Sequence, residues 1–166
     1  MKTKVNFVRQ QGFKEAPSSA CSCQYEALML QPRVLGILVS VGLVLQAWPY
    51  FLALSALLWW NVALPRINPF DALYNHFVAP AGGLLPLGPA PGPRRFAQGM
   101  AGTLMLAIAL ALFSGWGAAA WGFEAFLAVA LGALLLGRFC AGSYLYLLLT
   151  GQARFANRTL PWARAE

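Results

Sequence analysis

Charged residues are scarce in this sequence, and acidic residues are the scarcest. Only 10% of the 166 residues are charged, 5 acidic and 12 basic, whereas soluble domains carry about a quarter. No charged residue lies between Arg33 and Arg66, and Glu124 alone lies between Arg95 and Arg138. A bilayer crossing requires uncharged apolar runs of about 20 residues. The composition therefore excludes a soluble globular protein and indicates an integral membrane protein.

Residues that bind metals or carry redox chemistry are also few. The chain has one histidine, His76, and three cysteines. A single histidine makes neither a zinc site nor a haem site without other ligands. The sequence has no haem-attachment motif, phosphate-binding glycine loop or hydrolase nucleophile elbow. We therefore predict no bound metal and no cofactor, and the sequence favours a protein that is not an enzyme.

The basic residues lie outside the apolar runs, where they report membrane topology. The net charge of +7 comes from lysines and arginines in the N-terminal segment, the central loop and the C-terminal segment. None lies in the turns near Trp48 and Trp116. Because cytoplasmic loops carry an excess of Lys and Arg, both termini and the central loop are expected in the cytoplasm, with the chain in the cytoplasmic membrane. This distribution argues against nucleic-acid binding.

The apolar runs predict an all-α polytopic membrane protein of two helical hairpins, with residues 1–29 and 151–166 as cytoplasmic tails and 30–150 as the membrane domain. The four transmembrane helices are expected at about 30–47, 50–64, 96–116 and 120–137. Small residues four apart, as at Gly36 and Ser40 or Ala128 and Gly132, allow close helix approach. Membrane anchors are expected at Arg33, Arg66, Arg95, Arg138, Trp48 and Trp116.

A short helix is predicted in the loop between the hairpins. Asn68 suits the N-cap and Pro69 the first helical position. The apolar residues that follow recur at helical spacing: Phe70, Leu73, Tyr74, Phe77 and Val78. Three turns are too short to cross a bilayer, so we expect an interfacial helix with this apolar stripe against the membrane.

The last apolar run is too long for one straight crossing. An unbroken helix over 120–149 would measure about 45 Å at 1.5 Å per residue, against a hydrocarbon core of roughly 30 Å. The helix is therefore expected to tilt strongly, kink or break, with Gly137 or Gly142 as the place of a break.

Cys140 is the first candidate for chemistry. Arg138 lies close by, and a break at Gly137 would place Cys140 near a helix N-terminus; both features lower the pKa of a thiol. Ser143, three residues further on, shares its helix face and could hydrogen-bond the sulfur. The alternative is a small apolar residue that packs at a helix crossing, with Arg138 reaching the interface.

Three other residues are candidates with simpler alternatives. Cys21 and Cys23 could relay sulfur or bind a soft metal ion together with Cys140, or they are incidental residues of a flexible tail. Glu124 is the only acid within an apolar run, and an intramembrane acid is a functional candidate. At its shallow depth, Glu124 is expected instead to reach the headgroups or to pair with a partner protein.

Three segments carry a family resemblance: Asn68-Pro69-Phe70, Arg94-Arg95-Phe96-Ala97-Gln98, and Gly137-Arg138-Phe139-Cys140-Ala141-Gly142-Ser143. Together they resemble an uncharacterised bacterial four-helix membrane family, catalogued as a domain of unknown function, over about residues 30–150. Many members carry Cys-x-x-Cys in the last segment, which implies thiol redox activity and a bacterial inner membrane. This chain has Ser143 at the second position, and a lone cysteine cannot close the internal disulfide of a dithiol exchange.

Three hypotheses about function follow. The first is a non-catalytic subunit or scaffold in the bilayer that packs with partner membrane proteins or as a homo-oligomer. The second is a redox or sulfur-relay protein centred on Cys140. The third is a small transporter of sulfur species or soft metal ions, although the predicted helices hold few polar residues at mid-membrane, where secondary transporters place their sites.

Overall fold

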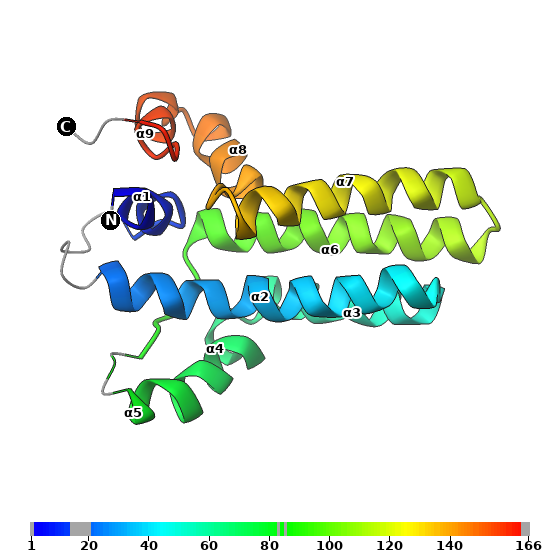
Figure 1. Cartoon of the computed structure of the whole chain (residues 1–166), viewed down its shortest axis with the longest axis horizontal. Helices are drawn as coiled ribbons and strands as arrows, with labels where there is room; N and C mark the ends of the chain where they lie inside the picture. Colours follow the sequence, from blue (N-terminus) through cyan, green and yellow to red (C-terminus); the bar gives the residue numbers. More distant parts are fainter. Residues whose placement is uncertain (1, 14–20, 83, 85, 164–166) are drawn as a thin grey trace.

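Four long helices form the body of the protein. The computed structural model describes residues 2–13, 21–82, 84 and 86–163, and every regular element within them is helical. The long helices are α2 (Cys21–Leu45), α3 (Trp48–Ala63), α6 (Gly92–Phe113) and α7 (Gly117–Leu135) (Figure 1). The predicted all-α class with two helical hairpins is confirmed.

Three of these helices are long and apolar enough to cross a membrane: Gln24–Leu45 within α2, α6 and α7. The 16-residue α3 reaches that threshold only together with Pro65–Ala81, from which it is bent by 116°. Counting this bent pair as one span brings the total in the described chain to 4. The apolar helices thus indicate a membrane-spanning protein.

The two ends of the bundle differ. At one end, which we call the turn end, short connections after α2 and α6 reverse the chain, with positive φ angles at Gln46 (47°) and Gly115 (71°). Trp48 and Phe113 pack edge to face across this end, with ring centroids 5.2 Å apart. The other end, the cap end, carries the short helices: α1 (Lys2–Gln10), η1 (Pro65–Ile67), α4 (Pro69–Leu73), η2 (Tyr74–Val78), α5 (Ala79–Ala81), α8 (Ala141–Leu149) and α9 (Ala153–Arg158) (Figure 1).

The described parts of both terminal segments pack onto the cap end instead of standing apart as tails. The side chains of Phe7 and Val8 in α1 are fully buried, and they join a core cluster that includes Met29 and Cys140. Asn6 donates a hydrogen bond from Nδ2 to the carbonyl of Leu160 at 3.1 Å, which ties the two termini together. The first long helix also begins earlier than predicted, because α2 starts at Cys21 and not near residue 30.

The segment between the hairpins begins as predicted, but part of its apolar stripe packs against the bundle. Asn68 accepts a hydrogen bond from the backbone N–H of Phe70 at 2.9 Å, so the predicted N-cap is confirmed. Phe70 and Tyr74 are buried in the core, whereas the other residues of the predicted stripe are exposed: Leu73, Phe77 and Val78. The exposed residues are the ones left to face a membrane, and the segment winds as a π-helical turn over Tyr74–Val78.

The long final run breaks where glycine permits it. The α7 helix ends at Leu135 and α8 begins at Ala141, and Arg138 between them has a φ of 54°. A Cβ at Gly137 would lie 2.7 Å from the carbonyl oxygen of Ala133, closer than side chains tolerate. The predicted break at Gly137 is confirmed, and it turns α8 away from the axis of α7 (Figure 1).

Candidate functional site

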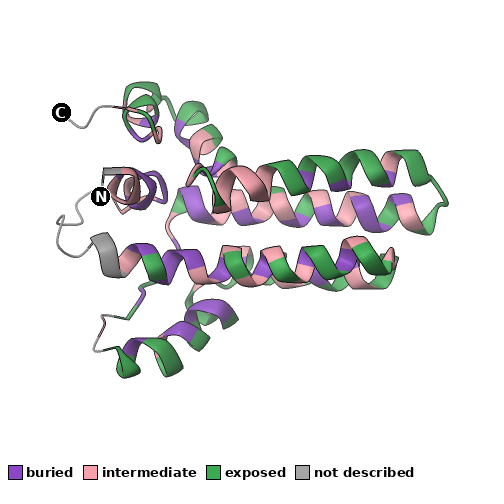
Figure 2. Cartoon of the chain, viewed as in Figure 1, coloured by how far each residue is buried: buried purple, intermediate pink, exposed green. Residues whose placement is uncertain are grey.

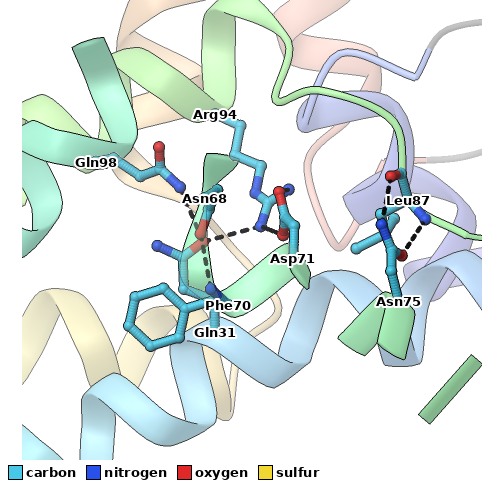
Figure 3. Close-up of polar contacts among 8 residues, drawn as sticks. All are labelled: Gln31, Asn68, Phe70, Asp71, Asn75, Leu87, Arg94 and Gln98. Atoms are coloured by element: carbon cyan, nitrogen blue, oxygen red, sulfur yellow. Dashed lines mark hydrogen bonds and ion pairs between the residues drawn. The ribbon is translucent and has the colours of Figure 1, made fainter. Parts of the chain in front are cut away.

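A buried polar cluster joins three helices at the cap end (Figure 3). Arg94 donates two hydrogen bonds to the carboxylate of Asp71, at 2.6 Å from Nη2 to Oδ1 and 3.0 Å from Nη1 to Oδ2. Arg94 Nη2 and Gln98 Nε2 each donate to Gln31 Oε1 at 2.8 Å. We call these four residues the Arg94 cluster: Gln31, Asp71, Arg94 and Gln98, each 7% exposed or less.

Local structure explains why these side chains meet. Arg94 and Gln98 lie one turn apart on α6, so they share a helix face. Asp71 stands in the first turn of α4, next to the Asn68 cap, where the helix dipole favours an acid. The ion pair of Arg94 with Asp71 makes the cluster electrically neutral, which is what a buried pair in an apolar bundle requires.

One atom of the cluster has no partner. Gln31 Oε1 accepts hydrogen bonds from Arg94 Nη2 and from Gln98 Nε2. Because the amide nitrogen of Gln98 points toward Gln31, the amide oxygen of Gln98 points away from Gln31 (Figure 3). Gln98 Oε1 is buried without any hydrogen-bond donor. Buried acceptors normally have donors, so this oxygen is an exception within an otherwise paired cluster.

The Arg94 cluster borders a cavity of about 910 Å³. Gln31, Arg94 and Gln98 line it, together with mostly apolar residues from α2, α3, α6, α7 and α8. Two of its lining residues, Met100 and Phe126, are 37% and 61% exposed, so the cavity opens on the side of the bundle. A volume of this size falls within the usual range of roughly 300–1,000 Å³ for small-molecule sites.

Cys140 lies in the wall of this cavity and is 7% exposed. It precedes α8, and its backbone N–H donates to Gln10 Oε1 at 2.9 Å. Ser143 Oγ lies 3.3 Å from the Cys140 sulfur and 3.2 Å from the carbonyl of Pro93, so the structure brings together the predicted Cys140 and Ser143.

Arg138, the predicted charged neighbour of the Cys140 thiol, does not face it. Arg138 points elsewhere: its guanidinium donates to Thr3 Oγ1 at 2.8 Å and lies 5.5 Å from the centre of the Tyr25 ring. The side chains of Cys21 and Cys23 lie outside the described residues. Across the part of the chain that the structure describes, no three His, Cys, Asp or Glu residues are grouped to hold a metal ion.

Glu124 corrects an expectation from the sequence. Its side chain is 1% exposed and both carboxylate oxygens accept from Gln46 Nε2, at 3.1 and 3.0 Å. The Glu124 carboxylate therefore does not extend to the headgroups or require a partner protein. The side-chain amide of Gln46, in the turn between α2 and α3, donates hydrogen bonds to it inside the bundle. Gln46 lies in the turn of the first hairpin, where its φ is 47°. Its hydrogen bonds to Glu124 on α7 therefore link the turn ends of the two hairpins.

A second hollow, the α2–α7 groove, runs between those two helices with a volume of about 1,120 Å³. Small residues from both helices line it: Gly36 and Ser40 from α2, and Ala128 and Gly132 from α7. A Cβ placed on Gly132 would have no atom within 4 Å. The exposed residues of α7 lie between Gly117 and Val129, toward the turn end (Figure 2).

The predicted membrane anchors divide between the two ends. Trp48 and Trp116 are exposed at the turn end. The arginines lie toward the cap end, where Arg33 pairs with Glu26 at 3.0 Å and Arg95 donates to the carbonyl of Val62 at 2.7 Å. Arg66 is exposed in η1, and Arg138 lies at the break before α8.

The buried polar residues that sequence reasoning missed are those of the Arg94 cluster. Arg94 and Gln98 appeared in the sequence only within a family segment, and Gln31 and Asp71 were not singled out. The sequence did contain a signal for them. Burying a polar side chain within an apolar helix costs free energy, so Gln31 and Gln98 are expected to have hydrogen-bonding partners.

Comparison with known proteins identifies a family for this chain. A search of curated proteins and a search of solved structures found no match. A family model, described as a domain of unknown function (DUF4395), matches residues 27–150. The matched region spans α2 to α8 and contains the Arg94 cluster and Cys140, and it excludes α1 and α9. The chain therefore belongs to the DUF4395 family of domains of unknown function.

Proposed function

We propose that this chain is a non-catalytic membrane subunit that holds a transmembrane helix of a partner protein in the α2–α7 groove. The observation that carries the proposal is the groove itself, with small residues on both walls. Small residues let helix backbones approach closely, which is the main source of packing energy between helices in lipid. The open space at Gly132 is where such a helix would contact α7.

The charge at one end of the α2–α7 groove indicates which charge the partner helix carries there. Arg33 and Arg138 line its cap end, and Lys4 lies nearby in contact with Glu26 at 3.2 Å. These three cations outnumber the one acid, so the region is positive. We expect the partner helix to carry an acidic residue where it leaves the groove.

Substitution of Gly132 by leucine tests the proposal. A Cβ at this position meets no atom within 4 Å, so the added side chain should enter the groove with the fold intact while the partner is lost. The matched control is Gly122→Leu, which also enters open space on α7 but lies outside the groove. The measurement is recovery of partner proteins by mild-detergent purification and quantitative mass spectrometry.

A partner recovered with the wild type and with Gly122→Leu, and reduced at least about tenfold with Gly132→Leu, is the expected result. A tenfold loss corresponds to about 1.4 kcal/mol. The proposal is wrong if Gly132→Leu and Gly122→Leu recover the same proteins in the same amounts, or if the wild type purifies as a stable monomer alone.

The same proposal places the protein in the cytoplasmic membrane with its cap end in the cytoplasm. Support comes from the arginines, which lie toward the cap end, and from the positive-inside rule. A cysteine introduced as Ser114→Cys, at the turn end, should react with a membrane-impermeant maleimide added to intact cells, whereas the wild-type chain should not. Reaction of Ser114→Cys only in inverted vesicles would reverse the orientation.

The thiol hypothesis is the second candidate because Cys140 lines a cavity and its sulfur has Ser143 as a hydrogen-bonding neighbour. The geometry supports it less well, since Arg138 faces Thr3 and Tyr25 instead of the Cys140 sulfur. The reactivity of Cys140 that would favour this candidate is measured in the Gly142 experiment below.

A further inference from the structure

We propose that the cavity beside the Arg94 cluster binds a neutral lipophilic molecule that has one long hydrocarbon chain and a hydroxyl head. This goes beyond the partner-helix proposal, because the cavity lies around α6 and the groove lies between α2 and α7. Three features of the cavity support this ligand: the orphan oxygen of Gln98, the charge balance around it, and the length and opening of the cavity.

The head group follows from Gln98. Its side chain is 6% exposed and lines the cavity, and its Oε1 has no donor. Flipping the amide would not help, because Gln31 Oε1 would then face a second acceptor. A buried acceptor in this position is satisfied by a ligand that donates a hydrogen bond, and a hydroxyl group does so without bringing a charge.

Charge balance selects a neutral head over an acid. Asp71 already neutralises Arg94, so the cluster offers no free cation. A carboxylate head would set its oxygens against Gln98 Oε1, acceptor against acceptor. Arg95 also lines the cavity and donates to the carbonyl of Val62, with no carboxylate partner among the described residues, so a fatty acid held by Arg95 is the competing ligand.

The body of the ligand follows from the shape of the cavity. Its lining on α6 extends from Gly92 to Ala107, about 22 Å at 1.5 Å per residue, and the side chains beyond the cluster are mainly apolar. An elongated apolar space with one polar end suits a single hydrocarbon chain. The exposed Met100 and Phe126 in the lining mark an opening toward the region where lipid surrounds the helices.

The test uses the full chain in lipid nanodiscs with three photoreactive probes of equal chain length: a primary alcohol, the corresponding carboxylic acid and its methyl ester. Labelled residues are located by peptide mass spectrometry. The expected result is labelling of cavity-lining residues by the alcohol, at least about tenfold above the ester, a difference of about 1.4 kcal/mol in binding. The acid should label them less than the alcohol.

Two variants separate specific binding from partition into lipid. Gly99→Leu places a side chain into the cavity at a position where a Cβ meets only Val62, at an ordinary 3.6 Å, and should abolish alcohol labelling. The control Gly122→Leu should label like the wild type. Gln98→Met should remove the preference for the alcohol over the ester, and if that variant does not fold, Gly99→Leu still decides.

Three results would overturn the proposal. Equal labelling by alcohol and ester would show attraction by hydrophobicity alone. Stronger labelling by the acid would assign an anion site to Arg95. Labelling that persists in Gly99→Leu, or that falls outside the cavity, would show that the cavity is not the site. None of these outcomes depends on whether a partner helix occupies the α2–α7 groove.

Discussion

Asp71→Asn is expected to destabilise the folded chain by about 3–5 kcal/mol, the usual cost of breaking a buried ion pair by removing one partner. The substitution leaves the Arg94 guanidinium charged, 5% exposed and without its carboxylate. It also loosens α4 from α6, since both oxygens of Asp71 accept from Arg94. The measurement is thermal or denaturant unfolding in detergent, followed by tryptophan fluorescence.

Two control variants test whether the loss of stability comes from the buried ion pair. Glu26→Gln breaks the exposed contacts with Lys4 and Arg33, where the side chains are between 34% and 52% exposed, and should cost less than about 1 kcal/mol for each pair. Asp71→Leu combined with Arg94→Met removes both charges, so it should be less destabilising than Asp71→Asn. An Asp71→Asn protein as stable as Glu26→Gln would show that the pair does not hold the cap end together.

Gly142→Ala is expected to destabilise the chain by about 1–3 kcal/mol, as overpacking of a tight contact does. A Cβ at Gly142 would lie 2.7 Å from Ala97 Cα and 2.8 Å from Ala97 Cβ, so α8 must move away from α6. Because Cys140 directly precedes α8, this movement should also speed alkylation of Cys140 by a membrane-permeant maleimide. Both quantities are measured on the same detergent-purified protein.

Gly122→Ala is the matched control, since a Cβ there meets nothing within 4 Å. That variant should be as stable as the wild type or gain up to about 1 kcal/mol from helix propensity, with Cys140 still protected. Equal stability of Gly142→Ala and Gly122→Ala would contradict the close contact with Ala97. Rapid alkylation of Cys140 in the folded wild type would contradict its burial and favour the thiol function.

Local patterns in the sequence predicted the elements that depend on near neighbours. The uncharged runs indicated the long helices, because a bilayer crossing demands them whatever lies beside it. Asn68 followed by Pro69 predicted a helix start, and the structure confirms it because an N-cap is formed within a few residues. Gly137 predicted a break for the same reason, through a contact with Ala133 four residues earlier.

Predictions about faces and partners were less secure, because they depend on elements far apart in the chain. The apolar stripe from Phe70 to Val78 was assigned to the membrane, but Phe70 and Tyr74 are buried against the bundle instead. Glu124 looked as if it would reach the headgroups, but Gln46, 78 residues away, accommodates it inside the bundle. Neither outcome follows from spacing on one helix.

The sequence by itself therefore determined the class of this protein, the two hairpins and the place where the last run breaks, since these depend on composition and on contacts between near neighbours. The tertiary structure alone decided the Arg94 cluster, the orphan oxygen of Gln98 and the cavity beside Cys140. Arg94 lies 23 residues from Asp71 and 63 from Gln31, so their meeting depends on how three helices pack. Helical spacing places residues on a face, and only packing decides what that face meets.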